Sequence, residues 1–528
     1  MIGNLGWLAA SLPEYHRFKR DTARCEKVQR QLLKSYLGAN ARTHFGREHD
    51  FASIRSWEEF ASRVPLRRYD DYAPWIARIA NGDRDVLTRD PVRIFEPSSG
   101  SSGAAKRIPF TATLQQEIRR AVAAWVASTF LSDRALLGGR AYWSLTPRIY
   151  LDEPADSVIP VGFEDDSAYL GGLARYFINQ TLVAPPGLGR VQDMEEFWRL
   201  TLLLLLQSRD LRMLSVWHPS YLELLIRRMR NNWTDLLRDL ASGLSASDPS
   251  LCIRPQPARS RELAEAGSDI LHGIWPRLRL ISCWADSHAA GAMPALQGLF
   301  PGVRIQAKGL VATEAFVTIP MGPVRPLAIR SHFFEFLGPD DRIFAPWQLE
   351  HGGQYSVVIT TGGGLYRYRL ADRVQVTGFL GETPCLVFLG KEDRVADFFG
   401  EKLSEQFVAG ALRQTLEKFR MQPDFALLAM EDACSPPAYV LYMQSRKPAP
   451  AALPRQLDEA LQANPHYALC RRLGQLDGAR VCELSGNAFE DYTRRMRELG
   501  MRVGDIKPTP LSQHRGWQEH FRIAPRQD

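Results

Sequence analysis

The sequence predicts an α/β protein with a large N-terminal domain of mixed sheets and helices, including a β-barrel-like layer, and a small α+β C-terminal domain. The chain has 528 residues, more than one hydrophobic core usually supports. Residues 325–390 carry short alternating apolar runs between glycine-rich turns, a pattern typical of antiparallel sheet, with strands expected at 355–360, 366–370, 373–379 and 385–389. After Gly390, helical and strand patterns alternate through a segment of ordinary domain size. We therefore expect two domains, residues 1–390 and 391–528.

The first part of the N-terminal domain contains predicted helices and one strand. Residues 14–80 are polar and amphipathic, with apolar residues at spacings of three and four, which indicates helix. Residues 91–97 are typical of a short strand, and residues 113–129 return to the helical pattern. The small residues between them, 98–105, therefore form a loop that joins a strand to a helix.

The later elements follow from the same signals. Residues 195–241 predict two strong helices, with residues 217–220 as the break and cap between them. Residues 277–283 and 303–307 are apolar runs between turn signals, which predict buried strands. The C-terminal domain is predicted as helix, two strands, helix, strand and helix, at residues 402–420, 425–430, 438–443, 453–464, 479–484 and 487–498.

Composition argues against several classes of protein. The longest apolar run, residues 202–206, is far shorter than the roughly 20 residues of a membrane helix. Residues 1–13 lack the cationic start of a secretory signal. The seven cysteines show neither a CxxC pair nor zinc-site spacing, which favours reduced thiols. We therefore expect a cytoplasmic protein that does not bind a membrane.

The net charge of +7 does not by itself indicate nucleic-acid binding. Acidic residues lie between the cations along the chain, and no nucleic-acid motif accompanies them, so we expect no nucleic-acid partner. Attraction for an anionic small molecule, such as a nucleoside triphosphate, explains the charge equally well. Only ten of the 66 basic side chains are lysines, so a lysine inside a motif is less often accidental.

The first candidate site is the segment 98–106. Gly100 and Gly103 permit positive φ angles and allow backbone N–H groups to face an anion. Lys106 adds a point charge. Hydroxyl groups donate readily to phosphate oxygens, and the segment has four, on Ser98, Ser99, Ser101 and Ser102. The alternative is a flexible linker of glycine and serine, and the segment does not match the Walker pattern.

The second candidate site is the segment 309–314, which follows a predicted buried strand. Glu314 stands beside the hydroxyl of Thr313, with Ala312 before them. Such a pair can hold Mg²⁺ together with a phosphate oxygen, because Mg²⁺ favours oxygen ligands and keeps several waters. A Thr-Glu pair is common in proteins, so this segment indicates a site only in combination with others.

The third candidate site is the segment 361–372, in which three glycines precede an aromatic and basic strand that ends in Asp372. An ionised carboxylate only accepts hydrogen bonds, so Asp372 can take both hydroxyls of a ribose. The alternative is a hairpin in which the aspartate starts a turn.

Taken in this order, the three segments resemble the auxin-responsive (Gretchen Hagen) acyl acid-amido synthetases of the adenylate-forming superfamily. Residues 99–106 are similar to the superfamily phosphate loop Ser-Gly-Thr-Thr-Gly-x-x-Lys, and their length matches the superfamily rather than the longer plant loop, which indicates a bacterial-type member. Residues 310–314 resemble Tyr-Gly-x-Ser/Thr-Glu, with Leu310 where an adenine-stacking tyrosine is usual. Residues 365–379 resemble Tyr-Arg-Tyr-Arg-x-Gly-Asp-x-Val-x-Val-x-Gly-Phe, with Ala371 in place of the glycine.

The resemblance also covers both ends of the chain. Residues 40–47 and 64–69 fit the N-terminal part of the family. Residues 504–508 resemble a late Gln-Tyr-Lys-x-Pro motif, which implies that Lys507 is a catalytic lysine. The hinge of the mobile C-terminal domain is expected at Gly390, Lys391 and Asp393.

The resemblance implies an enzyme that uses ATP and Mg²⁺ to convert a small-molecule carboxylic acid into an acyl-adenylate. It then passes the acyl group to an amine, with an amino acid as the expected acceptor. Lys106, Glu314 and Lys507 are the expected catalytic residues, and Glu314 is also the expected metal ligand. Asp372 is expected to bind the ribose, and the C-terminal domain is expected to turn about its hinge between the two steps.

Three alternatives remain at this stage. A coenzyme A or carrier-thiol ligase would share the first step, and the length of the phosphate loop favours it. A non-catalytic nucleotide-binding protein of the same fold would be expected to lack Lys507, Glu314 or Asp372, and all three are present. A nucleic-acid-binding protein is supported by net charge alone. The acid and the acceptor are not specified by the sequence.

Overall fold

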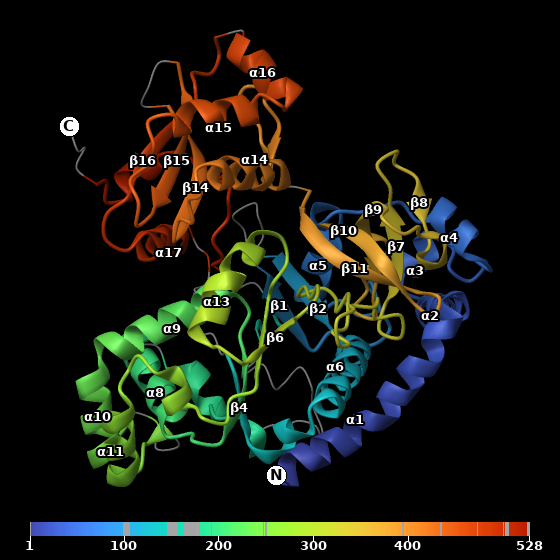
Figure 1. The fold of residues 1–528 in the computed structure, drawn as a ribbon. Coiled ribbons are helices and arrows are strands. Elements are labelled where there is room, and N and C mark those ends of the chain that lie inside the picture. Colours follow the sequence, from blue (N-terminus) through green and yellow to red (C-terminus); the bar gives the residue numbers. More distant parts are fainter. Residues whose placement is uncertain are drawn as a thin grey trace. The chain divides into compact units, whose positions relative to one another are not determined.

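The chain divides into two units within strand β11 (Figure 1). One unit contains the described residues up to Phe388, and the other contains those from Leu389 onward. Each unit has hydrophobic cores of its own. The computed structural model describes residues 2–98, 106–144, 157–162, 177, 180–191, 193–246, 248, 251–392, 395–432, 436–472, 474–499, 501 and 506–524.

The N-terminal unit begins with five helices, as the pattern over residues 14–80 predicts. They are α1 (Ile2–Asp21), α2 (Cys25–Asn40), α3 (His44–Glu48), α4 (Trp57–Arg63) and α5 (Tyr69–Ala80). The hydroxyls of Thr43 and Ser56 cap α3 and α4 by accepting hydrogen bonds from first-turn amides. Helix α1 starts before the predicted range and continues through Pro13, because packing along α6 (Ala112–Ser132) stabilises it.

Two antiparallel strands bracket the serine–glycine segment. In the register of β1 (Ile94–Ser98) and β2 (Lys106–Phe110), Ser98 pairs with Lys106. Helix α6 follows directly, and the hydroxyl of Thr111 caps it by accepting the Leu114 amide. The predicted strand before the segment and helix after it are confirmed, but the segment joins two strands, because the unpredicted strand β2 lies between it and α6.

A parallel sheet of four strands lies further along the N-terminal unit, in the order β3-β4-β5-β6. Its strands are β3 (Arg140–Trp143), β4 (Leu211–Ser215), β5 (Leu280–Cys283) and β6 (Arg304–Ala307). The predicted strands at residues 277–283 and 303–307 are thus confirmed as β5 and β6. Helix α6 covers one face, where the Trp125 indole donates to Gln306 of β6 at 3.0 Å.

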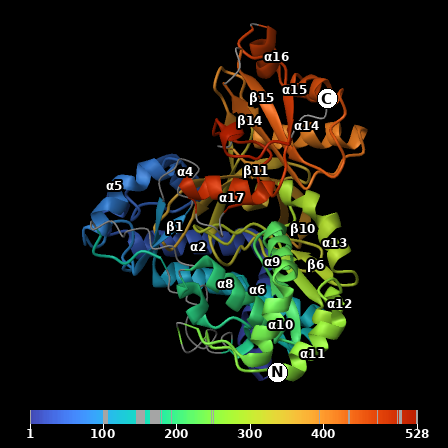
Figure 2. The same cartoon turned by 90° about the vertical axis from the view of Figure 1, so that its left-hand side faces the viewer.

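Helices cover the other face of the parallel sheet and share a hydrophobic core with it. In both views of the ribbon, α8 to α11 group together (Figures 1 and 2), and Figure 1 shows β4 beside them. The helices of this layer are α8 (Met194–Leu206), α9 (Pro219–Asn231), α10 (Trp233–Ser242), α11 (Pro257–Ala266), α12 (Leu271–Ile274) and α13 (Met293–Leu299).

The prediction of two helices over residues 195–241 is wrong, because three helices and strand β4 occupy this range. Strand β4 is almost wholly buried, and its apolar residues continue the leucine-rich pattern of α8. Periodicity alone does not separate a short buried strand from a helix. The predicted break at residues 217–220 lies at the start of α9.

The region predicted as a barrel-like layer is an antiparallel sheet in the order β11-β10-β9-β7-β8. It comprises β7 (Phe333–Leu337), β8 (Ile343–Phe344), β9 (Gln354–Thr360), β10 (Tyr368–Leu380) and β11 (Thr383–Lys391). The antiparallel prediction is confirmed, but the described strands form an open sheet rather than a closed barrel. Two strands predicted around residues 366–379 are one strand, β10, whose register shifts between Arg369 and Arg373.

The C-terminal unit is built on a sheet in the order β14-β15-β16. One face forms a core with α14, α15 and α16, and the other forms a core with α17, because successive strand residues alternate between the two cores. The elements are β12 (Val395–Ala396), β13 (Leu403–Ser404), α14 (Glu405–Lys418), β14 (Phe425–Glu431), β15 (Ala438–Gln444), α15 (Leu453–Leu461), α16 (Pro465–Arg472), β16 (Arg480–Glu483) and α17 (Ala488–Glu498). The predicted α+β order is confirmed, with α16 as an addition.

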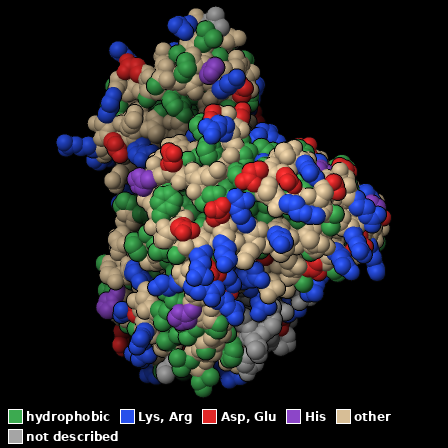
Figure 3. Space-filling model, turned by 90° about the vertical axis from the view of Figure 1, so that its right-hand side faces the viewer, with side chains coloured by type: hydrophobic (Ala, Val, Ile, Leu, Met, Phe, Trp, Pro, Cys, Tyr) green, Lys and Arg blue, Asp and Glu red, His purple; other side chains and the backbone are tan. Residues whose placement is uncertain are grey.

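The described helices include none that is both long and apolar enough to cross a bilayer. On the face drawn in Figure 3, Lys and Arg side chains are interspersed with Asp and Glu. The alternation of charges seen along the sequence is therefore also present on this surface.

Candidate active site

Strand β10 carries two of the residues that form the candidate site. Tyr368 lies at its start and is buried, and Asp372 lies four residues later and is 3% exposed. Between them the ladder with β9 is irregular, and Ala371 has a φ of +60°. This irregularity changes the alternation of side chains along the strand. The result is a buried carboxylate close to a buried phenol.

Glu314 reaches the same phenol from a different segment. The backbone of residues 311–316 folds into a tight hairpin, closed by hydrogen bonds between Ala312 and Ala315. Glu314 follows Thr313 in this turn and is 7% exposed. The Tyr368 hydroxyl donates to Glu314 Oε1 at 3.2 Å. The hairpin therefore brings the second candidate segment against the third.

Lys106 joins the cluster through Tyr69. The Lys106 ammonium lies 5.7 Å from the centroid of the Tyr69 ring. The Arg107 amide donates to the Tyr69 hydroxyl at 2.7 Å. Tyr69 opens helix α5, and the nearby Arg67 pairs with the backbone of Tyr368. The start of β2, the start of α5 and the start of β10 thus meet at one place.

The pKa values of Tyr368 and Tyr69 are both raised, and nearby carboxylates contribute to each rise. Burial raises the pKa of Tyr368 well above its ordinary value, and the charges of Glu314 and Asp372 raise it further. Burial also raises the pKa of Tyr69, which the hydrogen bond from the Arg107 amide partly offsets, while Glu314 adds to the rise. Both phenols therefore stay protonated at neutral pH; the Tyr368 hydroxyl donates to Glu314, and the Tyr69 hydroxyl accepts from the Arg107 amide.

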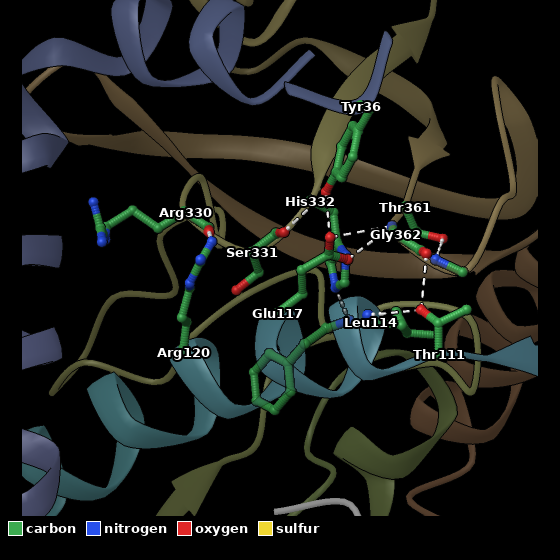
Figure 4. Close-up of polar contacts among 12 residues, drawn as sticks. Tyr36, Thr111, Leu114, Glu117, Arg120, Arg330, Ser331, His332, Thr361 and Gly362 are labelled. Atoms are coloured by element: carbon green, nitrogen blue, oxygen red, sulfur yellow. Dashed lines mark hydrogen bonds and ion pairs between the residues drawn. The ribbon is translucent and has the colours of Figure 1, made fainter. Parts of the chain in front are cut away.

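A second group of buried polar residues is centred on Glu117 (Figure 4). Glu117 of α6 is 2% exposed and accepts hydrogen bonds from the Tyr36 hydroxyl at 2.7 Å, from His332 Nδ1 at 3.0 Å and from the Gly362 amide at 3.0 Å. Gly362 begins the glycine run of the third segment. A Cβ atom there would lie 2.5 Å from Glu117 Oε1, so only glycine allows this approach.

The residues present fit a Mg²⁺ ion that is shared with a nucleotide. Mg²⁺ usually takes one or two protein carboxylates and completes its shell with water and substrate phosphates. Glu314 supplies one carboxylate, and within the described ranges no three His, Cys, Asp or Glu side chains gather into a metal-binding group. A Mg²⁺ ion bound at Glu314 would therefore take its remaining ligands from water and from the phosphate oxygens of the nucleotide.

The structure places the predicted site residues unevenly. Lys106, Glu314 and Asp372 come together, and Ala312 and Thr313 are in the same hairpin as Glu314. Ser98 ends β1, whereas Ser99, Gly100, Ser101, Ser102 and Gly103 lie outside the described residues.

The residues predicted for the hinge and the C-terminal domain lie apart from this cluster in sequence. Gly390 and Lys391 end β11, and Gly390 has a φ of +152°, in the region that favours glycine. Asp393 lies outside the described residues. Lys507 is in the C-terminal unit, where its carbonyl accepts a hydrogen bond from the Tyr492 hydroxyl at 3.0 Å.

Models of three successive domains match the chain in order. The GH3 family N-terminal domain matches residues 14–305, the GH3 family central domain residues 326–391, and the GH3 family C-terminal domain residues 406–516. The chain belongs to the GH3 family.

Relatives with curated names agree with this membership. The chain is 24% identical over 506 residues to the indole-3-acetic acid-amido synthetase GH3.17 of Arabidopsis thaliana, with 83% of this chain and 81% of the relative covered. It is also 24% identical to the indole-3-acetic acid-amido synthetase GH3.8 of Oryza sativa subsp. indica, over 80% of this chain and 76% of the relative.

Solved structures show the same fold. The GH3.15 acyl acid amido synthetase superposes with a TM-score of 0.83 at 20% identity, over 96% of this chain and 94% of that one. A 2-hydroxyisobutyryl-CoA ligase in its postadenylation state superposes with a TM-score of 0.50 at 13% identity, over 93% and 90% of the two chains. The GH3 fold of this chain is therefore also similar to that of an adenylate-forming ligase outside the family.

Sequence reasoning did not identify four residues of this GH3 site. Tyr69 and Tyr368 lie inside quoted motifs, but nothing local shows that they face the carboxylates. Glu117 and His332 lie in no motif, and their only sequence signal is a charged or polar residue within an apolar stretch. Their roles depend on contacts between segments more than 200 residues apart.

Proposed function

We propose that this chain activates a carboxylic acid with ATP to form an acyl-adenylate and then transfers the acyl group to an amine. The observation that carries the proposal is the cluster of Lys106, Glu314 and Asp372 around the buried phenol of Tyr368 and the half-buried phenol of Tyr69 in a GH3 family member. A cation, a metal-binding carboxylate and an acceptor-only carboxylate match the phosphates, Mg²⁺ and ribose of ATP.

The first half-reaction needs positioning and charge neutralisation around the α-phosphorus. Lys106 would neutralise phosphate charge, together with the hydroxyls and amides of residues 98–103. Asp372 would hold the ribose hydroxyls and so fix the nucleotide along β10. Bound Mg²⁺ would supply further positive charge to the phosphates beside Glu314. The acid carboxylate would then displace pyrophosphate.

The C-terminal unit would supply Lys507 in this step. We propose that the hinge at residues 390–393 lets this domain, residues 391–528, turn between adenylation and acyl transfer over the site held by residues 1–390. Gly390 supports the hinge assignment, because its φ angle is one that other residues rarely adopt. A lid that serves two steps in succession is a known way to use one active site twice.

The acyl acid would bind at the carboxyl edge of the parallel sheet, the usual ligand site of such sheets. Lys308 follows β6 there and donates to the Ser215 hydroxyl of β4 at 2.8 Å. The ring centroids of Trp217 and Trp125 lie 4.5 and 5.8 Å from its ammonium. A cation between indole rings suits an acid with a flat apolar body.

An amino acid is the proposed acceptor, because the named relatives are amido synthetases. A coenzyme A ligase is the second candidate, because the chain shares its fold with one such enzyme. We propose a cytoplasmic enzyme, since ATP is an intracellular substrate, and small molecules rather than nucleic acids or membranes as its partners.

ATP–pyrophosphate exchange over a panel of aromatic and aliphatic acids tests the first half-reaction. We expect exchange with at least one acid and release of AMP when amino acids are then added. Release of AMP with coenzyme A but not with amino acids would identify a thiol ligase instead. Absence of exchange with every acid would contradict the proposed adenylation.

A further inference from the structure

We propose that Glu117 and His332 form a positioning pair that fixes the Glu314 hairpin against the strand that carries Asp372. The inference rests on the proposed function, since it assigns the pair to the same nucleotide site. Neither residue would touch ATP. They would act through Phe316, two residues after Glu314, and through Gly362, which precedes β10.

The hydrogen bonds determine which protons the pair carries. The Phe316 amide donates to His332 Nε2 at 3.1 Å, so this nitrogen is an acceptor without a proton. The proton of the neutral ring is then on Nδ1, which donates to Glu117 Oε2 at 3.0 Å. Glu117 also accepts the Gly362 amide. One continuous chain of bonds therefore runs from the hairpin backbone to the glycine run (Figure 4).

A second contact joins the same two segments at another point. The Tyr368 hydroxyl of β10 donates directly to Glu314 in the hairpin. The hairpin is thus bonded to the 361–372 segment twice, once through Tyr368 and once through His332 and Glu117. A single contact would allow the hairpin to rotate about that point. Two separate contacts restrain both its distance from the 361–372 segment and its orientation.

The cost of the pair argues that it does more than fill the core. His332 is 0% exposed and Glu117 is 2% exposed. A buried carboxylate is expensive unless several donors satisfy it, and apolar side chains of similar size are often at least as stabilising. What an apolar pair would lack is a directional bond to the Phe316 amide. Position, rather than stability, is the property that this arrangement supplies.

Two substitutions at His332 separate the two bonds of the ring. In His332→Gln, the side-chain carbonyl can accept the Phe316 amide, but the bond to Glu117 is lost. In His332→Asn, the amide group can donate to Glu117, but no acceptor reaches Phe316. Both changes break one buried bond, so their effects on the melting temperature should be similar. Each change therefore interrupts the chain of bonds that joins the hairpin to Gly362.

We expect His332→Asn to lower the rate of pyrophosphate exchange by about ten- to a hundredfold, since small misplacements at a reacting centre cost this much. It should also weaken the stimulation of ATP binding by Mg²⁺ in calorimetry. Hydrogen exchange of the peptide covering residues 310–317 should become faster. His332→Gln should lower the exchange rate as well, because its loss of the bond to Glu117 also separates the hairpin from Gly362.

Tyr36→Phe is the matched control, because it removes one donor to Glu117 and leaves both bonds of His332 in place. We expect lower stability with unchanged pyrophosphate exchange. Wild-type exchange and Mg²⁺ dependence in both His332 variants would overturn the positioning role, as would a loss of exchange in Tyr36→Phe equal to that in the His332 variants.

The calorimetric and hydrogen-exchange readouts do not need turnover. If the wild type bound MgATP but activated no acid, the proposed function would fail while the two variants still tested the pair. If hydrogen exchange at residues 310–317 were as slow in both His332 variants as in the wild type, the pair would fail whatever the activity.

Discussion

Asp372 is almost fully buried and lies beside the register shift in strand β10. Its charge reaches Tyr368, which already donates to Glu314. A buried carboxylate at this place is held within the protein before any ligand arrives. Binding of a ribose would therefore require little rearrangement of the strand.

Asp372→Ala should weaken ATP binding about ten- to a hundredfold, because loss of a charged acceptor costs about 1.5–3 kcal/mol. Isothermal titration with ATP measures this directly. Far-UV circular dichroism and the thermal melt show whether the variant is folded. An unchanged affinity in a folded variant would contradict the assignment to the ribose.

The residue types that chemistry requires could be predicted, and their supporting contacts could not. Lys106, Glu314 and Asp372 stand in segments whose glycines, hydroxyls and carboxylates are unusual in sequence. Glu117 and His332 belong to separate elements. Nothing in their local sequence shows that the amide of Gly362, 245 residues from Glu117, donates a hydrogen bond to its carboxylate. Contacts of this kind arise from the tertiary fold rather than from local propensity.

At the scale of elements, β10 shows how a strand can turn a side chain toward a site. The family pattern has glycine where this chain has Ala371, and the φ of +60° at that residue lies in the left-handed region. A residue with a Cβ atom is strained there. The chain therefore tolerates local strain beside Asp372.

Ala371→Gly should relieve this strain. We expect the free energy of unfolding to rise by up to about 1 kcal/mol, because relief of left-handed strain outweighs the added freedom of the unfolded chain. Urea denaturation measures the change, and ATP affinity should stay the same. A decrease of more than about 1 kcal/mol in the free energy of unfolding would show that Ala371 is not strained in the folded protein.

The elements that the sequence predicts best are those with a clear period or clear punctuation. The C-terminal helices and strands agree with expectation because turn residues separate them. Strand β4 was missed because a short run buried on both sides has no period of its own. The two halves of β10 were predicted as separate strands because the irregularity near Ala371 interrupts the alternation.

At the scale of the whole molecule, the two units have separate cores, and buried cysteines report on each. Burial raises the pKa of Cys25 and of Cys283 to about 12, and both lie in the N-terminal unit. Cys470 is buried in the C-terminal unit, while Cys252 is exposed. The thiolate is the reactive form of cysteine, so the buried thiols should be inert while the fold persists.

We expect an alkylating reagent at pH 8 to modify Cys252 in the native protein and to leave the buried thiols of Cys25, Cys283, Cys385 and Cys470 unmodified. In a urea series, Cys470 should become reactive before Cys25 and Cys283, because the smaller unit buries a smaller share of its surface. Mass spectrometry of peptides locates each modification. Simultaneous exposure of the three would show that the units unfold as one.

Lys507 tests the two-unit mechanism, because it lies in the C-terminal unit whereas Lys106, Glu314 and Asp372 lie in the N-terminal unit. Lys507→Ala should lower pyrophosphate exchange about a hundred- to a thousandfold, since it removes a donor to charge that develops in the transition state. ATP affinity should change little. Acyl transfer from a supplied acyl-adenylate should survive much better.

The same variant has two outcomes that would contradict this role. Equal loss of both half-reactions would indicate that Lys507 supports folding or serves both steps. Loss of neither would show that the likeness at residues 504–508 is coincidental.

Strand β11 starts at Thr383 in one unit and ends at Lys391 in the other. The units are thus joined by ordered backbone rather than by a slack tether. A short connection keeps two linked groups at a high effective concentration, which falls as the connection lengthens. In these terms, residues 389–391 would set the local concentration of Lys507 at the proposed nucleotide site, and we expect each residue inserted there to lower that concentration.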